Sequence, residues 1–422
     1  MLRAFQMSPR EVSYDSVWTL LQAFLKASSP VEEEKCFSPL ADGAKYIDFT
    51  SYLLRCLQSA ITEANFTKTD VGVFYGRVVR LLEALLPMKM PKEFMGEPPA
   101  AKSDQAKRMR LPTLRHMLTD TWSKLFEKEL PDDLMLDSLM RLGDGQLDKM
   151  TDTARLLAPY VTTVFDPPSP DVPPSWSRAV SRAILKVIHL GGLNFDRLYP
   201  RLYQLLDDSL LTCPHADRFL VDLDDFLSSI HLPAGWVAAF AKRLAQLTVQ
   251  GASLWLLPPL LTVVANCLIR HPMSRVLVDR KSSSVDSKRR RLEDGANEEE
   301  HDEAEADECS GDPYTWRPNS LADDAPDALK SSLWELACLE KHYHPEVASL
   351  ALRVRQIAGS TKPDHLPDLK NQVRLGKNVL ESSKKKACQY LSVLQMTNAR
   401  IPSLSTLEGW TSNSEKEVRN TA

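Results

Sequence analysis

Apolar residues recur at helical spacing along most of this sequence. Three such faces occur in the first 190 residues, and the positions that define them are Val17, Leu20, Leu21, Phe24 and Leu25; Leu114, Leu118, Trp122 and Leu125; and Val180, Ile184, Leu185 and Ile188. The second helix should begin near Pro112, and the third should stop at Gly191-Gly192 because glycine readily ends a helix. No clear run alternates apolar and polar residues as a strand would. The pattern therefore predicts an all-α protein.

The pattern becomes denser between residues 198 and 247. Three further apolar faces follow one another there: Leu198, Leu202 and Leu205; Phe219, Leu223, Phe226 and Ile230; and Trp236, Phe240, Leu244 and Leu247. Because such short helices cannot bury their apolar faces alone, stacked antiparallel helices are the economical arrangement. We expect a helical-repeat array of the HEAT/armadillo-like kind, although the sequence shows no strict repeat period.

Three segments break the helical pattern. Residues 166–174 (DPPSPDVPP) predict an extended linker because they are rich in proline. Residues 281–312 contain five basic and twelve acidic residues, and they predict a disordered acidic insert because they have almost nothing to bury. Residues 359–422 are weakly patterned, so we expect a weakly ordered tail.

Residues 244–269 contain no charged side chain and are long enough to span a bilayer. Gln246, Gln250, Asn266 and the Pro258-Pro259 pair argue against a span. Two buried helices joined at a proline-initiated turn are therefore favoured, and a nuclear-envelope membrane protein remains the less favoured alternative.

Composition narrows the class of protein further. The net charge of −4, from 52 basic and 56 acidic residues, provides no overall attraction to nucleic acid. The seven cysteines form no C-x-x-C pair, which favours a reducing compartment over a disulfide framework. The first residues contain no apolar stretch of the kind that a secretory signal needs.

No catalytic motif is present, so we expect no enzymatic activity and no cofactor. Asp222, Asp224 and Asp225 are close enough in sequence to suggest metal or acid–base chemistry. They flank an apolar helix face, however, and a solvated polar face is the favoured interpretation.

The cysteine and histidine spacings do not predict a metal site either. Cys213 and His215 have no second ligand pair nearby, and we expect them in a loop before a helix. His342 and His344 should lie at the end of a helix that Pro345 stops, where a histidine favours the helix dipole.

One basic run stands inside the acidic insert. Lys288, Arg289, Arg290 and Arg291 precede an acidic block at 298–308. Such a run can be a nuclear import signal or a nucleic-acid contact, and a solvated charged segment is an equal alternative.

Several phrases in the second half resemble one known family. They are residues 194–207 (NFDRLYPRLYQLLD), 237–244 (VAAFAKRL), 268–272 (LIRHP), 331–336 (SSLWEL) and 342–347 (HYHPEV). Together they resemble the CCAAT-binding-factor domain family of nucleolar ribosome-biogenesis proteins. The resemblance covers about 190–357 well and 110–190 faintly, while the long acidic insert and the C-terminal tail depart from the family pattern.

The resemblance implies a helical-repeat fold without catalysis, located in the nucleus and its nucleolus. It also implies a scaffold in pre-ribosomal small-subunit particles, bound to a nucleolar protein 14-type partner and contacting pre-rRNA only indirectly. A chromatin- or DNA-associated factor of the same domain family is the alternative, and the mixed charge of the helices disfavours it.

The same resemblance, read with the helical pattern, divides the chain and suggests its contact residues. The expected regions are a divergent helical part at 1–110, a helical-repeat core at 111–280, the insert at 281–312, the end of the family domain at 313–358 and the tail at 359–422. Lys242 and Arg243 should project away from a packed helical hairpin. The side chains predicted to bind a partner are Trp236, Phe240, Lys242, Arg243, Trp334 and Tyr343. Packing within the fold is the favoured alternative for the segment around Phe240.

Overall fold

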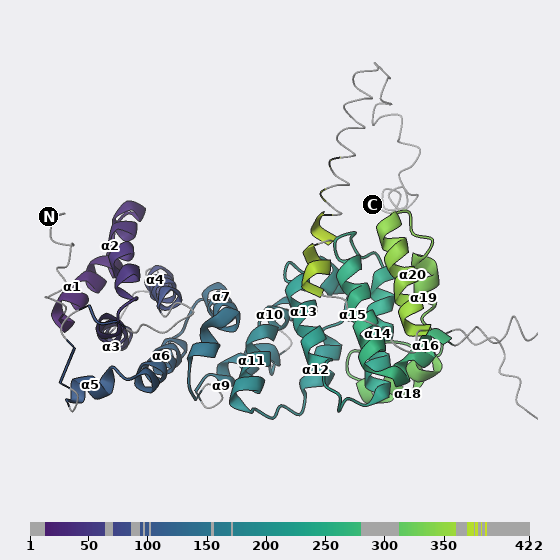
Figure 1. Ribbon diagram of the computed structural model, residues 1–422, viewed down its shortest axis with the longest axis horizontal. Coiled ribbons are helices and arrows are strands. Elements are labelled where there is room, and N and C mark those ends of the chain that lie inside the picture. Colours follow the sequence, from purple (N-terminus) through teal and green to yellow (C-terminus); the bar gives the residue numbers. More distant parts are fainter. Residues whose placement is uncertain are drawn as a thin grey trace, which may run out of the picture.

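The computed structural model is an elongated array of helices (Figure 1). It describes residues 13–63, 71–85, 93–95, 98–100, 103–152, 156–169, 172–279, 312–359, 369–374, 376–378, 381 and 385. In these residues the only extended pairing is an isolated bridge between Tyr46 and Glu93. The predicted all-α class and the helical-array architecture are confirmed.

Six helices form the N-terminal part of the array. They are α1 (Tyr14–Leu25), α2 (Pro30–Gly43), α3 (Ile47–Glu63), α4 (Val71–Ala84), α5 (Asp104–Arg108) and α6 (Leu111–Phe126). The side chains of Ser13 and Ser29 accept hydrogen bonds from the free backbone N–H groups at the starts of α1 and α2. Helix α3 packs between α1 and α6, so the apolar faces predicted on α1 and α6 are both buried against neighbours.

The middle of the array consists of shorter helices. They are α7 (Asp132–Arg141), the π-helical turn η1 (Leu142–Gln146), the 3-10 turn η2 (Leu147–Lys149), α9 (Ala158–Phe165), α10 (Pro174–Ala179) and α11 (Ser181–Gly191). The predicted linker lies between α9 and α10, and the predicted stop of α11 is confirmed because Gly192 adopts φ 61°. Gly143 allows η1 to approach α11, since a Cβ there would lie 2.9 Å from the backbone nitrogen of Ala183.

The C-terminal part contains the most completely buried helices. Its elements are α12 (Leu198–Gln204), η3 (Asp208–Thr212), α13 (Ala216–Phe226), α14 (Ala234–Val249), α15 (Leu257–Arg270), η4 (Pro272–Arg275), α16 (Val276–Asp279), α18 (Leu321–Lys330), α19 (Trp334–Leu339) and α20 (Pro345–Gly359). Helix α14 packs against α15, α18 and α19, and α20 covers the other side of α15. The segment that follows the insert therefore folds back onto α14.

The uncharged stretch at 244–269 forms the end of α14 and most of α15, which begins with Pro258 and Pro259 after a break. No helix in the described part of the chain is long and apolar enough to cross a membrane. The prediction that Ile230 completes the apolar face of α13 is wrong. That helix ends at Phe226, and the Ile230 side chain is 81% exposed in the following loop.

Two further predictions concern the acidic insert at 281–312 and the tail at 359–422. The insert, apart from Asp312, and its basic run Lys288, Arg289, Arg290 and Arg291 lie outside the described residues. In the tail, however, residues 369–374 and 376–378 are helical and return to the array (Figure 1). Most of the tail lies outside the described residues, so the expected weak order of 359–422 stays a prediction.

Candidate interaction site

The side chains of Lys242 and Arg243 are buried inside the array, where they are 0% and 3% exposed. The prediction that they project away from the packed hairpin is wrong. Helix α14 has α15 on one side and α18 and α19 on the other, so it has no long solvent-facing stripe. Buried charges need partners, and both residues have them.

Lys242 binds three acceptors that come from the last residue of the insert and from the segment that follows it. Its Nζ lies 2.7 Å from Glu335 Oε1, 2.7 Å from the Ser332 carbonyl oxygen and 2.5 Å from Asp312 Oδ2. An ammonium group has three N–H donors, so this arrangement uses all of them. The indole N–H of Trp334 also donates to Asp312, at 3.0 Å. We call Lys242, Asp312, Ser332, Trp334 and Glu335 the lysine cluster.

The two carboxyl groups of the lysine cluster have opposite pKa shifts. Burial raises the pKa of Glu335 above its ordinary value, and the attraction of Lys242 only partly opposes this shift. Burial also acts to raise the pKa of Asp312, but hydrogen bonds from Lys242 and Ser331 outweigh it and lower the pKa. The two pKa shifts thus have different causes, burial for Glu335 and hydrogen bonding for Asp312.

Arg243 connects α14 to two other parts of the chain. Its Nε donates to the Leu206 carbonyl oxygen at 2.7 Å, and its Nη2 donates to Asp208 at 2.8 Å. The guanidinium also lies 4.0 Å from the ring centre of Trp316, within the range of a cation–π contact. The arginine thus joins the loop after α12 to the segment after the insert.

A buried network of hydroxyl and carboxylate groups lies beside Phe240. The Tyr203 hydroxyl lies 2.5 Å from the Tyr314 hydroxyl and donates to Asp324 at 3.0 Å. Burial raises the pKa of both tyrosine hydroxyls, so they stay protonated and act as donors. Phe240 packs edge-on against Tyr203, with ring centres 5.3 Å apart. Phe240 is therefore a packing residue in this fold, in line with the favoured alternative.

The aspartates of α13 are also structural, but two of them are not solvated as predicted. Asp222 and Asp224 are buried, whereas Asp225 is exposed. Asp222 accepts a hydrogen bond from Ser181 and pairs with Arg182. Burial raises the pKa of Asp222 to about 6, against the hydrogen bond from Ser181 and the charge of Arg182. The face of α13 that was predicted to be solvated is covered by α11 and α15.

Asp224 is the most highly bonded of these aspartates. Its carboxylate accepts from Asn266 at 3.0 Å and from both terminal nitrogens of Arg270, at 2.8 and 3.0 Å. Asn266 and Arg270 belong to α15, so the carboxylate joins α13 to α15. No group of three or more His, Cys, Asp or Glu side chains in the described residues is arranged to hold a metal ion.

Three of the six predicted contact residues remain accessible. Trp236 is half-buried, Trp334 is 46% exposed and Tyr343 is 79% exposed. The prediction that Pro345 stops a helix is wrong, because Pro345 is the first residue of α20. Proline suits that position, since the first helical N–H has no partner within the helix.

Tyr343 lies in the turn between α19 and α20, where neighbouring groups hold it. Its ring centre is 4.3 Å from that of His342. The backbone N–H of His344 donates to His342 Nδ1 at 3.1 Å, and the N–H of His342 donates to the Leu339 carbonyl oxygen at 3.0 Å. An exposed aromatic ring on a hydrogen-bonded turn is a suitable anchor for another protein, because little side-chain freedom is lost on binding.

Sequence comparisons identify relatives of this chain. Residues 183–351 match the model of the CBF/Mak21 family, the region that contains the lysine cluster and Tyr343. The chain is 30% identical over 337 residues to the nucleolar complex protein 4 homolog of Homo sapiens, which covers 78% of this chain and 58% of the relative.

Two further relatives have the same name. The nucleolar complex protein 4 homolog of Danio rerio is 28% identical over 325 residues, covering 76% of this chain and 55% of the relative. That of Rattus norvegicus is 29% identical over 327 residues, covering 76% and 56%. The chain thus spans somewhat more than half the length of these relatives. The resemblance predicted from the sequence phrases is confirmed: residues 183–351 match the CBF/Mak21 family, and the chain is similar to the nucleolar complex protein 4 homologs over about three-quarters of its length.

Proposed function

We propose that this chain is a non-catalytic scaffold of ribosome biogenesis in the nucleolus. The observation that carries the proposal is its similarity, over about three-quarters of its length, to proteins named nucleolar complex protein 4 homolog. The fold supports it, because the buried charged residues of α13 and α14 are bonded to other parts of the array. These side chains stabilise the arrangement of the helices, and the outer surface of the array is left to bind other molecules.

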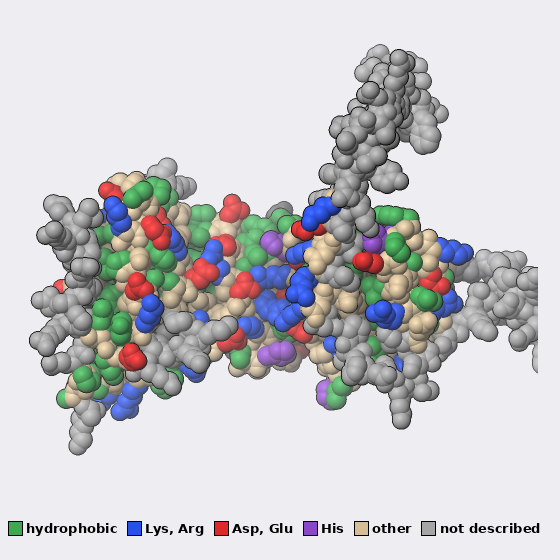
Figure 2. All heavy atoms as spheres, turned by 45° about the horizontal axis from the view of Figure 1, so that its top comes forward, with side chains coloured by type: hydrophobic (Ala, Val, Ile, Leu, Met, Phe, Trp, Pro, Cys, Tyr) green, Lys and Arg blue, Asp and Glu red, His purple; other side chains and the backbone are tan. Residues whose placement is uncertain are grey.

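The more specific role is maturation of the small ribosomal subunit, including pre-rRNA processing and the assembly and export of the subunit. In this role the chain binds a nucleolar protein 14-type partner, and it meets pre-rRNA mainly through that partner. Figure 2 shows acidic side chains scattered along the visible face of the array, together with basic side chains that gather most densely near its middle. Mixed charge of this kind suits a protein partner better than the phosphate backbone of RNA, which favours a basic stripe.

Tyr343 is the proposed anchor for the partner. Its side chain is 79% exposed, against 46% for Trp334, and its turn is fixed by the bonds around His342 and His344. Trp334 is a weaker choice for a test, because its indole also supports Asp312 in the lysine cluster.

Affinity purification of the tagged full chain from nuclear extract tests this proposal. We expect wild-type protein to recover the nucleolar protein 14-type partner together with small-subunit rRNA precursors. Tyr343→Ala should lower the recovery of the partner at least about tenfold, because truncating an anchor residue commonly costs that much affinity.

Ile230→Ala is the matched control. It removes an apolar side chain that is 81% exposed in a different loop, so recovery of the partner should not change. Recovery of chromatin proteins without pre-rRNA would contradict the proposed function and favour the DNA-associated alternative. Equal recovery with Tyr343→Ala and wild type would contradict only the assignment of the anchor.

A further inference from the structure

Part of the C-terminal segment lies against the array. Residues 369–374 and 376–378, which we call the strap, are helical and lie beside α13 and α15 (Figure 1). Leu369 is buried in the main apolar core, and Lys377 Nζ lies 2.6 Å from Asp217 Oδ2 on α13. The strap thus contacts helices that precede it by more than one hundred residues.

Gly376 lies against the backbone of the array. A Cβ atom built there would collide with the carbonyl oxygen of Trp255 and would lie 3.0 Å from its carbonyl carbon. Trp255 lies just before α15, so backbone meets backbone at this point. Only glycine permits so close an approach, because any larger residue would have to displace main-chain atoms.

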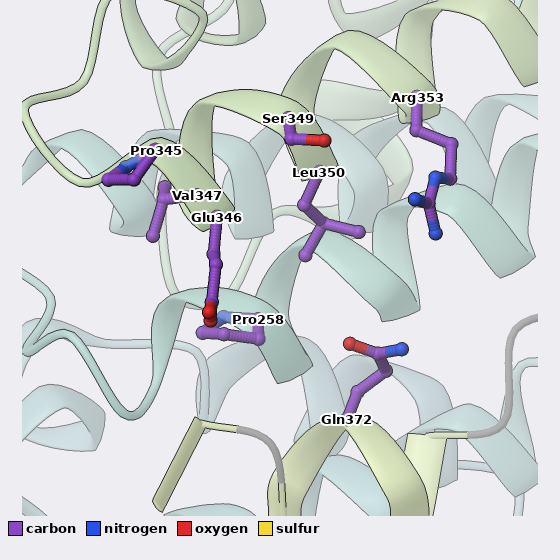
Figure 3. A pocket seen from close by; sticks show the side chains of 8 residues that line it. All are labelled: Pro258, Pro345, Glu346, Val347, Ser349, Leu350, Arg353 and Gln372. Carbon is purple, nitrogen blue, oxygen red and sulfur yellow. The ribbon is translucent and has the colours of Figure 1, made fainter. Parts of the chain in front are cut away.

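The strap is incompletely packed between Leu369 and Gly376. A cavity of about 290 Å³ remains between the strap, α20 and the first turn of α15. Figure 3 shows Gln372 of the strap on one side of this cavity, with Leu350 and Arg353 of α20 opposite and Pro258 of α15 at its edge. The Gln372 Oε1 atom is buried and has no hydrogen-bond partner among the described residues. An unfilled cavity and an unpaired acceptor both weaken the packing of the strap.

The ion pair between Lys377 and Asp217 adds little to this attachment. The lysine side chain is 56% exposed, and exposed pairs of this kind contribute only weakly to stability. The strap therefore has a well-fitted contact at Gly376, a buried anchor at Leu369 and an incompletely packed surface between them. Attachment to the same chain gives the strap a high effective concentration at this surface, which favours its binding despite the incomplete packing.

We propose that α13, α20 and the N-terminal end of α15 form a helix-binding groove, and that the strap is its resident and displaceable ligand. Because the strap occupies the groove, a competing helix can bind there only when the strap has left. A competitor that placed a larger apolar side chain beside Pro258 and Leu350 would fill the cavity that the strap leaves empty. This proposal does not depend on the proposed function.

Hydrogen–deuterium exchange of the full chain tests whether the strap is held at Gly376. In Gly376→Leu, the added side chain collides with Trp255, and backbone amides of 369–378 should exchange at least about tenfold faster. Asn378→Leu adds the same side chain at an exposed position of the strap and should leave exchange unchanged. Unaltered exchange in α14 would show that the array itself is intact.

A charge-reversal pair provides a second variant that does not depend on steric collision. Lys377→Glu should speed exchange of the strap roughly two- to fivefold, as expected from the loss of an exposed ion pair. Adding Asp217→Lys should restore the wild-type rate.

A peptide of residues 366–381 tests whether the emptied groove binds a helix. Gly376→Leu protein should bind this peptide at least about tenfold more tightly than wild-type protein, whose own strap competes at high effective concentration. Unchanged exchange in Gly376→Leu would overturn the placement of the strap. Faster exchange without peptide binding would overturn the groove as a ligand site, and the strap would then be ordinary packing.

Discussion

Lys242 illustrates how single residues hold this fold together. Its side chain has no exposed surface, yet its ammonium group is bonded to Glu335, Asp312 and the Ser332 carbonyl oxygen. Glu335 is equally buried, so each charge depends on the other for solvation. The pair connects a helix before the insert to a helix after it.

Removing one member of this pair should be far more damaging than removing both. Lys242→Met leaves the Glu335 carboxylate buried without its cation and should lower the free energy of unfolding by about 3–5 kcal/mol. Lys242→Met with Glu335→Leu should recover most of that loss, since two apolar side chains can pack where the ions were. Urea unfolding of the full chain measures the unfolding free energy of the single and the double variants. A double variant that loses the sum of the two single losses would contradict the coupling.

Asp222 should make the stability of the protein depend on pH. Its pKa is about 6 in the fold against an ordinary value of 3.8, so the folded state binds the proton more tightly. The stabilisation is therefore complete below about pH 4 and is lost as the pH rises through about 6, by roughly 3 kcal/mol in total.

Comparison with Asp222→Asn isolates this effect. Between pH 4.5 and 7, the unfolding free energy of wild type should fall by about 2 kcal/mol relative to the variant. Denaturant unfolding of both proteins at the two pH values measures this change in the difference between their unfolding free energies. Wild type and variant need not be equally stable at either pH. A constant difference between the two proteins would show that Asp222 does not titrate in this window.

At the scale of elements, α14 organises the C-terminal part of the array. It contacts α15, which precedes the insert, and α18 and α19, which follow it. The N–H of Leu333 also donates to the Leu277 carbonyl oxygen at 2.8 Å, close to the start of the insert. The segment that precedes the insert is therefore bonded directly to the segment that follows it.

Cutting the insert should leave the two parts of the chain associated. A specific protease site is placed within 290–300 and cleaved in the purified protein. The cleaved protein is then analysed by size-exclusion chromatography without denaturant. Because α18, α19 and α20 are packed on α14 and α15, the two fragments should elute together at the volume of the uncut protein. Separation of the fragments would contradict the role of α14 as the element that joins the two sides.

Helical period and proline or glycine signals were enough to predict many of these elements. The faces containing Leu118 and Leu185 are buried as predicted, and Gly192 ends α11. The environments of Lys242 and Asp222 could not be predicted in the same way. Their partners are tens of residues away, and an amphipathic pattern identifies an apolar face without showing what covers the polar one. Tertiary packing covered the polar positions of Asp222 on α13 and Lys242 on α14.

At the scale of the whole molecule, one continuous core runs from α1 to α20. Such arrays present extended surfaces, because each helical layer contacts only its neighbours. The resemblance to the family could be inferred from short phrases in residues 194–347, and the match over 183–351 confirms that resemblance. The return of the strap could not be inferred, because its main contact is a glycine against backbone atoms, which leaves no apolar pattern.

Sedimentation of nuclear extract on a density gradient tests the central claim most directly. A nucleolar scaffold of small-subunit assembly should migrate with particles that contain small-subunit rRNA precursors, and it should leave those fractions after treatment with ribonuclease. Migration in light fractions only, or with chromatin in a ribonuclease-resistant form, would contradict a role in small-subunit assembly.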